Sequence, residues 1–271
     1  MSSSGHALRS NERRSKKVMQ PLRRVLANVY DELAPDHTIR GATVLPAKHL
    51  RFGGNEFKND DFFLASAQSE AQRLVRLCAL GAASAVLDIG CGVGRLPIGI
   101  LDQVGDIRAY RGVDVDSKSV RWCKLHIEGT HPSFKFRLID VKNRCYNPNG
   151  SPLSDSFRLP FDDGSFDIIY LYSVFSHMLE DDVSVYLGEF SRLLRSDGKV
   201  FLTAFLEEGV PDVMENPPDY RMKWNGPLHC VRFNLSFFTG LARGAGLRVS
   251  KFEYGRETDG QSAIYLSKMS A

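Results

Sequence analysis

Three glycines at alternate positions indicate where this chain binds a ligand. The segment "AVLDIGCGVGRLPI" (residues 85–98) starts as an apolar run, passes through Gly90, Gly92 and Gly94, and continues with apolar residues at helical spacing. Glycine lets the backbone approach a ligand closely, and a helix that begins directly afterwards points its free N–H groups at that ligand. The pattern therefore predicts a strand, a ligand-binding loop and a helix in succession.

A carboxylate further along the chain narrows the class of ligand. Asp114 ends "AYRGVD", 24 residues after Gly90, at the expected carboxyl end of the next strand. A carboxylate at that place can accept hydrogen bonds from both hydroxyls of a ribose. A dinucleotide site would need the spacing G-x-G-x-x-G, and Arg95 occupies its third glycine position here. We therefore expect a nucleoside-containing cofactor other than NAD.

Strands and helices alternate around these residues. Short apolar runs predict strands at 85–89, 109–113, 134–139, 166–172 and 198–205, and apolar spacing predicts helices near 61–79, 94–103, 117–127, 181–194 and 235–244. Strands interleaved with helices indicate a parallel sheet that is covered on both faces. Two further runs, 247–254 and 262–268, flank the turn-rich "GRETDGQ" and predict an antiparallel hairpin.

Four successive motifs resemble those of class I methyltransferases that depend on S-adenosylmethionine (SAM). They are "VLDIGCGVGRL", "GVDVD", "LPFDDGSFDIIYLYSVFSHM" and "LLRSDGKVFLTAF", and they cover about residues 85–205. The terminal hairpin matches the sixth and seventh strands of that fold. The resemblance implies SAM as cofactor. It also implies a Rossmann-like three-layer α/β sandwich, with a mostly parallel seven-stranded sheet and a C-terminal antiparallel hairpin.

The resemblance also implies roles for matching positions. Asp88 would anchor the glycine loop and reach the methionine amino group, and Asp114 would bind the ribose hydroxyls. The other implied cofactor contacts are the backbone of Gly90, Cys91 and Gly92 beside the methionyl and ribose groups, Val115, Asp140 and Val141 at the adenine, and Ser173 under the sulfonium.

The acid at the adenine has two candidates. The family runs quickly from its third strand to "LPF", whereas "VKNRCYNPNGSPLSDSFR" intervenes here. Asp155 stands four residues before Leu159, a spacing that is also common for this acid. We favour Asp140 because it directly follows an expected strand.

Two histidines are candidate general bases for a hydroxyl acceptor, whose proton must leave as the methyl group arrives. His177 follows the fourth strand of the motif series, and His229 follows the loop 206–228. We rank His177 first, although either ring can instead have a packing or capping role. No spacing of His, Cys or carboxylates predicts a metal site, and Asp181 and Asp182 are expected to begin a helix.

Composition restricts the compartment and the partners. Five dispersed cysteines favour a reducing cytoplasm, and no apolar run approaches the roughly 20 residues that a membrane span needs. The net charge is +3, but residues 1–27 hold seven Lys or Arg and one Glu, so the remainder is mildly acidic. We expect a cytoplasmic protein without a membrane span and without a nucleic-acid partner.

The sequence divides into three regions: a disordered basic arm at 1–17, an N-terminal helical cap at 18–80 and the methyltransferase domain at 81–271, with insertions at 141–159 and 206–228. We expect methyl transfer to a small-molecule or glycan acceptor, with oxygen as the favoured atom. Two alternatives stay open. One is an RNA or protein methyltransferase that uses the basic arm for phosphate contacts, and the other is a SAM-binding partner protein without catalysis.

Overall fold

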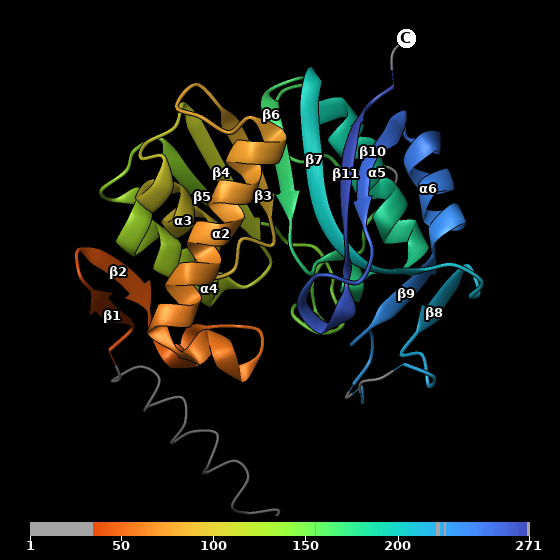
Figure 1. The fold of residues 1–271 in the computed structure, drawn as a ribbon, viewed down its shortest axis with the longest axis horizontal. Helices are drawn as coiled ribbons and strands as arrows, with labels where there is room; N and C mark the ends of the chain where they lie inside the picture. The colour runs from red at the N-terminus through yellow and green to blue at the C-terminus, as the bar shows by residue number, and fades with distance from the viewer. Residues whose placement is uncertain (1–34, 155, 221–222, 225, 270–271) are drawn as a thin grey trace, which may run out of the picture.

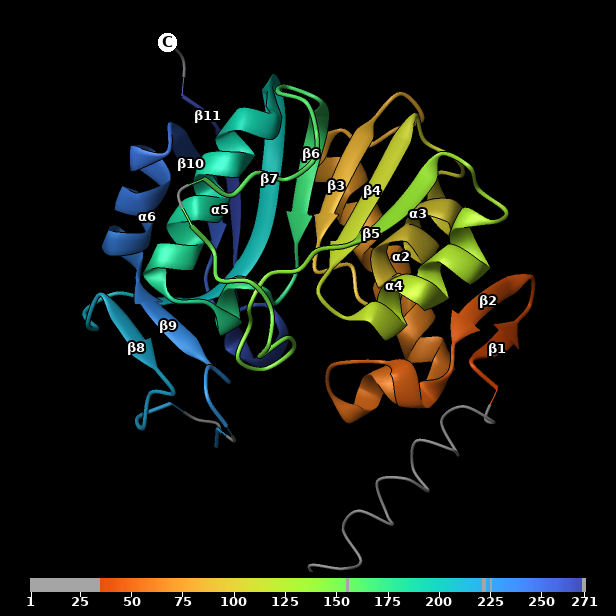
Figure 2. The same ribbon diagram turned by 180° about the vertical axis from the view of Figure 1, so that it is seen from behind.

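The computed structural model describes residues 35–154, 156–220, 223–224 and 226–269, so the expected basic arm, the helix expected before residue 34, and Asp155 lie outside the described residues. A twisted sheet forms the middle layer, with helices on both faces (Figures 1 and 2). One face carries α2 (Asp60–Cys78), α3 (Arg95–Gln103) and α4 (Ser117–Cys123), and the other carries α5 (Glu180–Leu193) and α6 (Leu235–Gly244). The predicted three-layer α/β sandwich is confirmed.

The order of the strands places a reversal at the centre of the sheet. The order is β10 (Leu247–Glu253), β11 (Ser262–Lys268), β7 (Leu194–Glu207), β6 (Phe166–Leu171), β3 (Ala85–Ile89), β4 (Ala109–Asp114) and β5 (Phe134–Leu138). Along this path only β11 runs antiparallel to its neighbours. The predicted sheet and terminal hairpin are confirmed. The chain leaves β3 in one direction through β4 and returns to its other side as β6, and ligands bind at such switch points in open α/β sheets.

Alternate residues of each central strand fill two separate apolar layers. In β3, Leu87 and Ile89 pack in the layer that contains α5 and α6, whereas Val86 packs in the layer that contains α2, α3 and α4. Both faces are buried, which explains the continuous apolar runs in the sequence. Gly99 lets α3 lie against α2, because a Cβ at this position would overlap the carbonyl of Ala67.

The segment before α2 differs from the expected helical cap. Strands β1 (His37–Arg40) and β2 (Thr43–Pro46) form an antiparallel hairpin. Their β-branched residues favour strands, and Gly41, at φ +60°, supplies the turn between them. Two short turns, η1 (Lys48–Leu50) and η2 (Asn55–Lys58), then lead into α2, which matches the helix predicted near 61–79.

The two insertions lie near the carboxyl ends of the central strands. Within and after 206–228, β8 (Val213–Glu215) pairs with β9 (Val231–Asn234), which pairs in parallel with the end of β7. The described part of 141–159 contains isolated bridges between Val141 and Ser151 and between Asn143 and Asn147. Three short turns complete the fold: η3 (Lys124–Glu128), which is a π-turn, η4 (Phe175–His177) and η5 (Thr258–Gly260). Among the described residues, no helix is both long and apolar enough to cross a bilayer.

Candidate functional site

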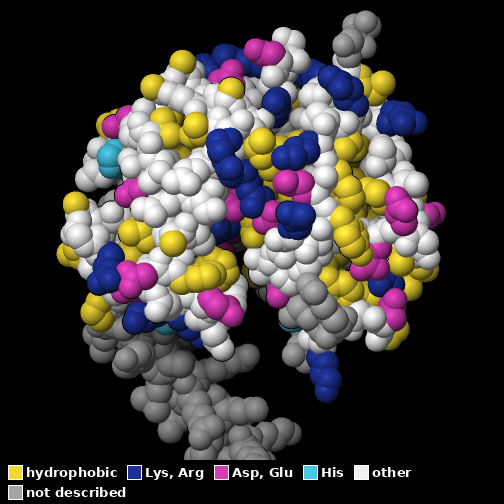
Figure 3. Space-filling model, viewed as in Figure 1, with side chains coloured by type: hydrophobic (Ala, Val, Ile, Leu, Met, Phe, Trp, Pro, Cys, Tyr) yellow, Lys and Arg dark blue, Asp and Glu magenta, His cyan; other side chains and the backbone are white. Residues whose placement is uncertain are grey.

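A cavity of about 560 Å³ opens at the carboxyl ends of β3, β4 and β6, at the reversal of strand order. This volume lies within the range of about 300–1,000 Å³ that is usual for small-molecule sites. Figure 3 shows the molecule hollowed between the N-terminal segment and the C-terminal half of the sheet. The predicted site residues that line the cavity are Asp88, Gly90, Cys91, Gly92, Asp114, Val115, Val141, Ser173, His177 and His229.

The glycine loop has the backbone that the sequence predicts. Gly90, Gly92 and Gly94 all have positive φ, at 72°, 50° and 79°. A Cβ at Gly90 would come within 2.6 Å of Val174 Cγ2, and one at Gly94 within 2.8 Å of Ile127 Cδ1. A Cβ at Gly92 would instead meet nothing within 4 Å, because this glycine faces the cavity. Gly92 therefore leaves room where a ligand can contact the backbone directly.

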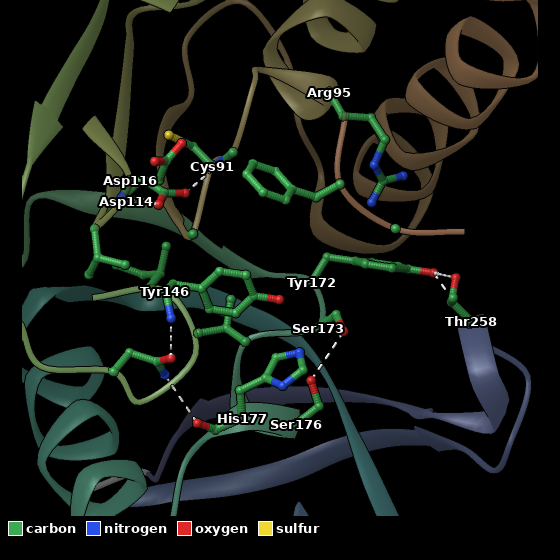
Figure 4. Close-up of a pocket in the computed structure, with 18 of the residues that line it drawn as sticks. Cys91, Arg95, Asp114, Asp116, Tyr146, Tyr172, Ser173, Ser176, His177 and Thr258 are labelled. Carbon is green, nitrogen blue, oxygen red and sulfur yellow. Dashed lines mark hydrogen bonds between the residues drawn. The ribbon is translucent and has the colours of Figure 1, made fainter. Parts of the chain in front are cut away.

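Asp114 lies at one end of the cavity with part of its hydrogen-bonding capacity unused. Its Oδ2 accepts the N–H of Gly92 at 2.7 Å, and its Oδ1 accepts the N–H of Asp116 at 2.8 Å. A carboxylate has about four acceptor positions, so two remain for a ligand diol. Burial raises the pKa of this carboxyl, and the two backbone hydrogen bonds oppose that rise. The side chain is thus held by the loop and directed into the cavity (Figure 4).

Asp88 forms part of the cavity floor. Its side chain is 2% exposed and accepts a short hydrogen bond from the hydroxyl of Tyr110. Burial raises the pKa of Asp88 to about 7. A positively charged ligand group beside this carboxyl would favour the ionised form.

Arg95 lies at the opposite end from Asp114, and the sequence reasoning used it only as an argument against NAD (Figure 4). Its guanidinium carbon is 4.5 Å from the ring centre of Tyr172 and 5.5 Å from that of Phe57. Its hydrogen bond to Tyr170 Oη is long at 3.5 Å, and among the described residues no carboxylate forms an ion pair with it. A guanidinium in this state suits a ligand carboxylate. The sequence signal that could have identified Arg95 as a site residue is its position directly after the third glycine of the loop.

Ser173 lies two residues after the end of β6, in a strained conformation. Its φ is +59°, a region that L-residues rarely adopt, and its N–H donates to Thr203 Oγ1 at 2.8 Å. Its hydroxyl accepts from Gln261 Nε2 at 2.8 Å and lies 3.1 Å from that of Ser176. These contacts fix Ser173 in the cavity wall, between the two ends marked by Asp114 and Arg95 (Figure 4). Strain of this kind is concentrated at functional sites.

His177 points into the cavity from η4, directly after β6 (Figure 4). Its Nδ1 lies 2.9 Å from the carbonyl oxygen of Leu228, which can only accept, so Nδ1 carries the hydrogen and Nε2 has the lone pair. Burial lowers the pKa of His177, against a smaller rise from this hydrogen bond. The imidazole is therefore neutral at pH 7. Asn143 supports the turn by donating to the His177 carbonyl at 3.2 Å.

Five rings form a continuous aromatic wall on this side of the cavity. They are Tyr146, His177, His229, Trp224 and Phe205, whose successive ring centres are 5.5, 6.5, 5.5 and 5.7 Å apart. The 141–159 insertion contributes Tyr146. The backbone of Tyr146 is held in place by a hydrogen bond from its N–H to Asn143 Oδ1, at 3.1 Å. The structure thus brings both candidate histidines together, although they are 52 residues apart in the sequence.

Asp140 is the predicted site residue that does not line the cavity. Its exposed carboxylate accepts from Ser151 Oγ at 2.8 Å and from Asn147 Nδ2 at 3.2 Å, and these contacts hold its pKa below the usual range. Its neighbours Ile139 and Val141 do line the cavity, since side chains alternate along an extended segment. The carboxylate therefore orders the insertion. Its assignment as the acid at the adenine stays a prediction.

The cavity fits SAM on its own chemistry. Asp114 can accept from a ribose diol, the open backbone at Gly92 can lie against the ligand, and Arg95 can bind the methionine carboxylate. The apolar side chains of Val115, Ile139 and Val141 can cover a flat purine. When bound, SAM would supply a methyl group that its sulfonium already activates.

Comparison with known proteins agrees with this fit. A model of the methyltransferase domain matches residues 87–202. A demethylmenaquinone methyltransferase of Lactobacillus johnsonii is 26% identical over 185 residues, which span 68% of this chain and 64% of the length of that relative.

Two solved structures share the fold. The 1,6-didemethyltoxoflavin N1-methyltransferase of Burkholderia thailandensis, with bound 1,6-didemethyltoxoflavin and S-adenosylhomocysteine, is 19% identical with a TM-score of 0.51, over 78% of this chain and 82% of that one. The magnesium protoporphyrin IX methyltransferase of Synechocystis, with bound SAM, is 13% identical with a TM-score of 0.52, over 82% and 88%. Taken with the glycine loop, the strand order and the fit of the cavity, these matches identify residues 87–202 as a methyltransferase domain and show that the chain has the fold of the compared methyltransferases.

Proposed function

We propose that this protein is a class I SAM-dependent methyltransferase that acts on a hydroxyl oxygen of a small molecule, with His177 as the general base. The observation that carries the proposal is the fixed, neutral imidazole of His177 in the cavity wall, with its Nε2 lone pair available. His229, at a ring-centre distance of 6.5 Å, is the second candidate. A base is useful for an alcohol or phenol acceptor, whose oxygen becomes a good nucleophile only as its proton leaves.

The lining of the cavity supports an uncharged acceptor with an apolar or aromatic face. The aromatic wall offers ring surfaces for stacking. Among the described lining residues Arg95 is the only Lys or Arg, and it lies at the end of the cavity that we assign to the cofactor carboxylate. A phosphate-bearing acceptor would lack a counter-charge beside the wall. All three compared proteins are named for small-molecule acceptors, which agrees with a small-molecule acceptor here.

The chain's own groups have three tasks in the reaction. The wall and Ser173 hold the acceptor oxygen in line with the methyl group, and such positioning can supply much of the rate enhancement. His177 Nε2 accepts the hydroxyl proton while Nδ1 remains bonded to the Leu228 carbonyl. Phe52 and Tyr146, in edge contact at 6.2 Å, line the cavity from its two sides and reduce the access of water to it. The imidazolium then passes its proton to solvent.

The catalytic unit and the cellular compartment of the enzyme can also be inferred. We infer that residues 81–269 form the catalytic unit and that the hairpin and α2 cover its cofactor side. All five cysteines are free, and four of them are buried, which supports a reducing cytoplasm.

A labelled-methyl assay tests the proposed reaction. Hydroxylated, amino and thiol small molecules would be incubated with SAM carrying a labelled methyl group, and products identified by mass spectrometry. With the best hydroxyl acceptor, His177→Gln should lower kcat by about 10²–10⁴ while SAM affinity stays the same. A loss confined to His229→Gln would move the base to His229. Methylation of amines alone, or full activity in both variants, would overturn the proposal.

A further inference from the structure

We propose that Asp36, His37 and His126 form a binding site for a divalent transition-metal ion of the zinc type. The site lies outside the cofactor cavity, since none of the three residues lines it. Asp36 and His37 begin the N-terminal hairpin, and His126 lies in the π-turn η3, about 90 residues later in the chain. The sequence shows no ligand motif because the two segments meet only in the folded protein.

The ligand atoms already converge. Asp36 Oδ1 is 2.9 Å from His37 Nδ1, and Asp36 Oδ2 is 2.9 Å from His126 Nε2. All three ligand atoms lie within 4.8 Å of one another. Two atoms bound at about 2.0–2.1 Å to a tetrahedral ion are roughly 3.3–3.5 Å apart. Small side-chain movements are therefore enough to bring the three ligand atoms into the geometry that such an ion requires.

Neighbouring groups hold these ligands in place. The Trp122 indole N–H donates to the backbone carbonyl of Asp36 at 2.7 Å, which fixes the start of the hairpin. The same indole stacks on His126, with ring centres 4.8 Å apart and planes inclined by 29°. The π-turn itself presents His126 towards the hairpin, and π-turns are frequent at functional sites. The site is therefore organised by contacts that do not depend on the ion.

The donor set selects the class of metal. Two imidazole nitrogens and one carboxylate suit Zn²⁺, Co²⁺ or Ni²⁺, whereas Mg²⁺ prefers oxygen ligands. Three protein ligands leave a fourth position for water. Binding requires lone pairs on His37 Nδ1 and His126 Nε2, so each neutral ring carries its hydrogen on the other nitrogen in the bound form. The ion replaces the two Asp–His hydrogen bonds.

An ion at this place would cross-link the hairpin to the body of the domain. From β2 the chain continues through η1 to Phe52 and Phe57, which line the cofactor cavity. Because the ion binds the folded arrangement and not the unfolded chain, it should raise the melting temperature. The role that we infer is structural, and the methyl transfer does not depend on it.

Calorimetry with Zn²⁺ tests the site, on the full-length protein without an affinity tag. The chain offers a matched control in His131, whose Nδ1 lies 3.1 Å from Asp106 without a second histidine. Wild type and His131→Gln should each bind one Zn²⁺ at this site with equal affinity. His126→Gln should bind it at least about tenfold more weakly, since even outer-shell changes at metal sites cost that much. Zn²⁺ should raise the melting temperature of the first two proteins only, and Mg²⁺ that of none.

Equal Zn²⁺ affinity in His126→Gln and wild type, or no saturable binding in wild type, would overturn the proposal. SAM binding reports whether each variant is folded. If His126→Gln does not fold, His37→Gln is used in its place. Co²⁺ gives an independent readout, because a site with few ligands has strong visible absorption. That absorption should appear in wild type and be absent from the variant.

Discussion

At His177, burial and a fixed hydrogen bond act on the same imidazole. Burial lowers its pKa from the usual 6.5, and the contact from Nδ1 to Leu228 leaves Nε2 as the acceptor. A protonated ring cannot accept a proton, so the rate should rise with pH through the folded pKa, and the midpoint of this rise should lie below pH 6.5. The pH profile of kcat for a hydroxyl acceptor measures this limb.

His177→Gln provides the control for that profile, because it removes the titrating ring. Its residual rate should lack the acidic limb. A limb centred above pH 6.5, or one that persists in the variant, would assign the ionisation to another group.

Asp88 leads to a second prediction, on proton release. Its pKa of about 7 means that the carboxyl is partly protonated near neutrality. If the SAM ammonium binds beside it, the ionised form is favoured and a proton leaves on binding. Calorimetry at pH 7, in two buffers of different ionisation enthalpy, should show this release for wild type. It should be absent from Asp88→Asn, in which Tyr110 still has an oxygen to donate to. Equal release from both proteins would place the proton elsewhere.

Two residues show where prediction of the site from sequence ends. Asp114 was predicted because it stands at the carboxyl end of a strand, and in the structure the N–H groups of Gly92 and Asp116 hold its carboxylate at the cavity. Asp140 also follows a strand, but the insertion supplies Ser151 and Asn147, which bind its carboxylate outside the cavity. Partners that compete for a side chain cannot be read from spacing alone.

At the scale of elements, two glycines in the turn between β3 and α3 have different roles: Gly94 packs against neighbouring side chains, whereas Gly92 faces the cavity. Gly92 and Gly94 both have positive φ, so alanine at either position should cost about 1–3 kcal/mol of stability from backbone strain. Gly94→Ala also presses on Ile127 and Cys123, at 2.8 and 3.2 Å, and should be the less stable variant. Gly92→Ala meets only the cavity and should lose SAM affinity more than Gly94→Ala does.

Thermal unfolding and SAM calorimetry on the two variants measure this difference. If each variant loses SAM affinity in proportion to its loss of stability, Gly92 acts only as a turn residue and makes no special contact with the ligand.

The elements themselves were predictable where one strong signal was present. The central strands are apolar on both faces, so their runs agree with β3 and β11 to the residue. The hairpin β1–β2 was missed because strands of four residues give too short an alternation, and Gly41 favoured a loop. Short β9 was missed for a similar reason, since its pairing with β7 depends on contacts distant in sequence. The aromatic wall likewise joins residues from four segments: the 141–159 insertion, η4, β7 and the connection between β8 and β9.

At the scale of the whole molecule, charge separates the small-molecule function from its main alternative. The excess of basic residues lies within 1–27, outside the described residues, and the remaining chain is mildly acidic. On the face seen in Figure 3, Lys and Arg side chains are interspersed with Asp and Glu. This face therefore offers no continuous basic track for a polyanion.

Salt dependence tests that distinction. Four phosphate contacts from Arg13, Arg14, Lys16 and Lys17 would weaken binding about a hundredfold between 50 and 200 mM salt, because each contact adds about −0.9 to the logarithmic slope. For an uncharged small acceptor, kcat/KM should change little over this range. It should also be unaffected when these four residues are changed to Gln. A steep salt slope that disappears in the four-residue variant would instead support an RNA acceptor, because the released counterions would then belong to a phosphate backbone bound by the arm.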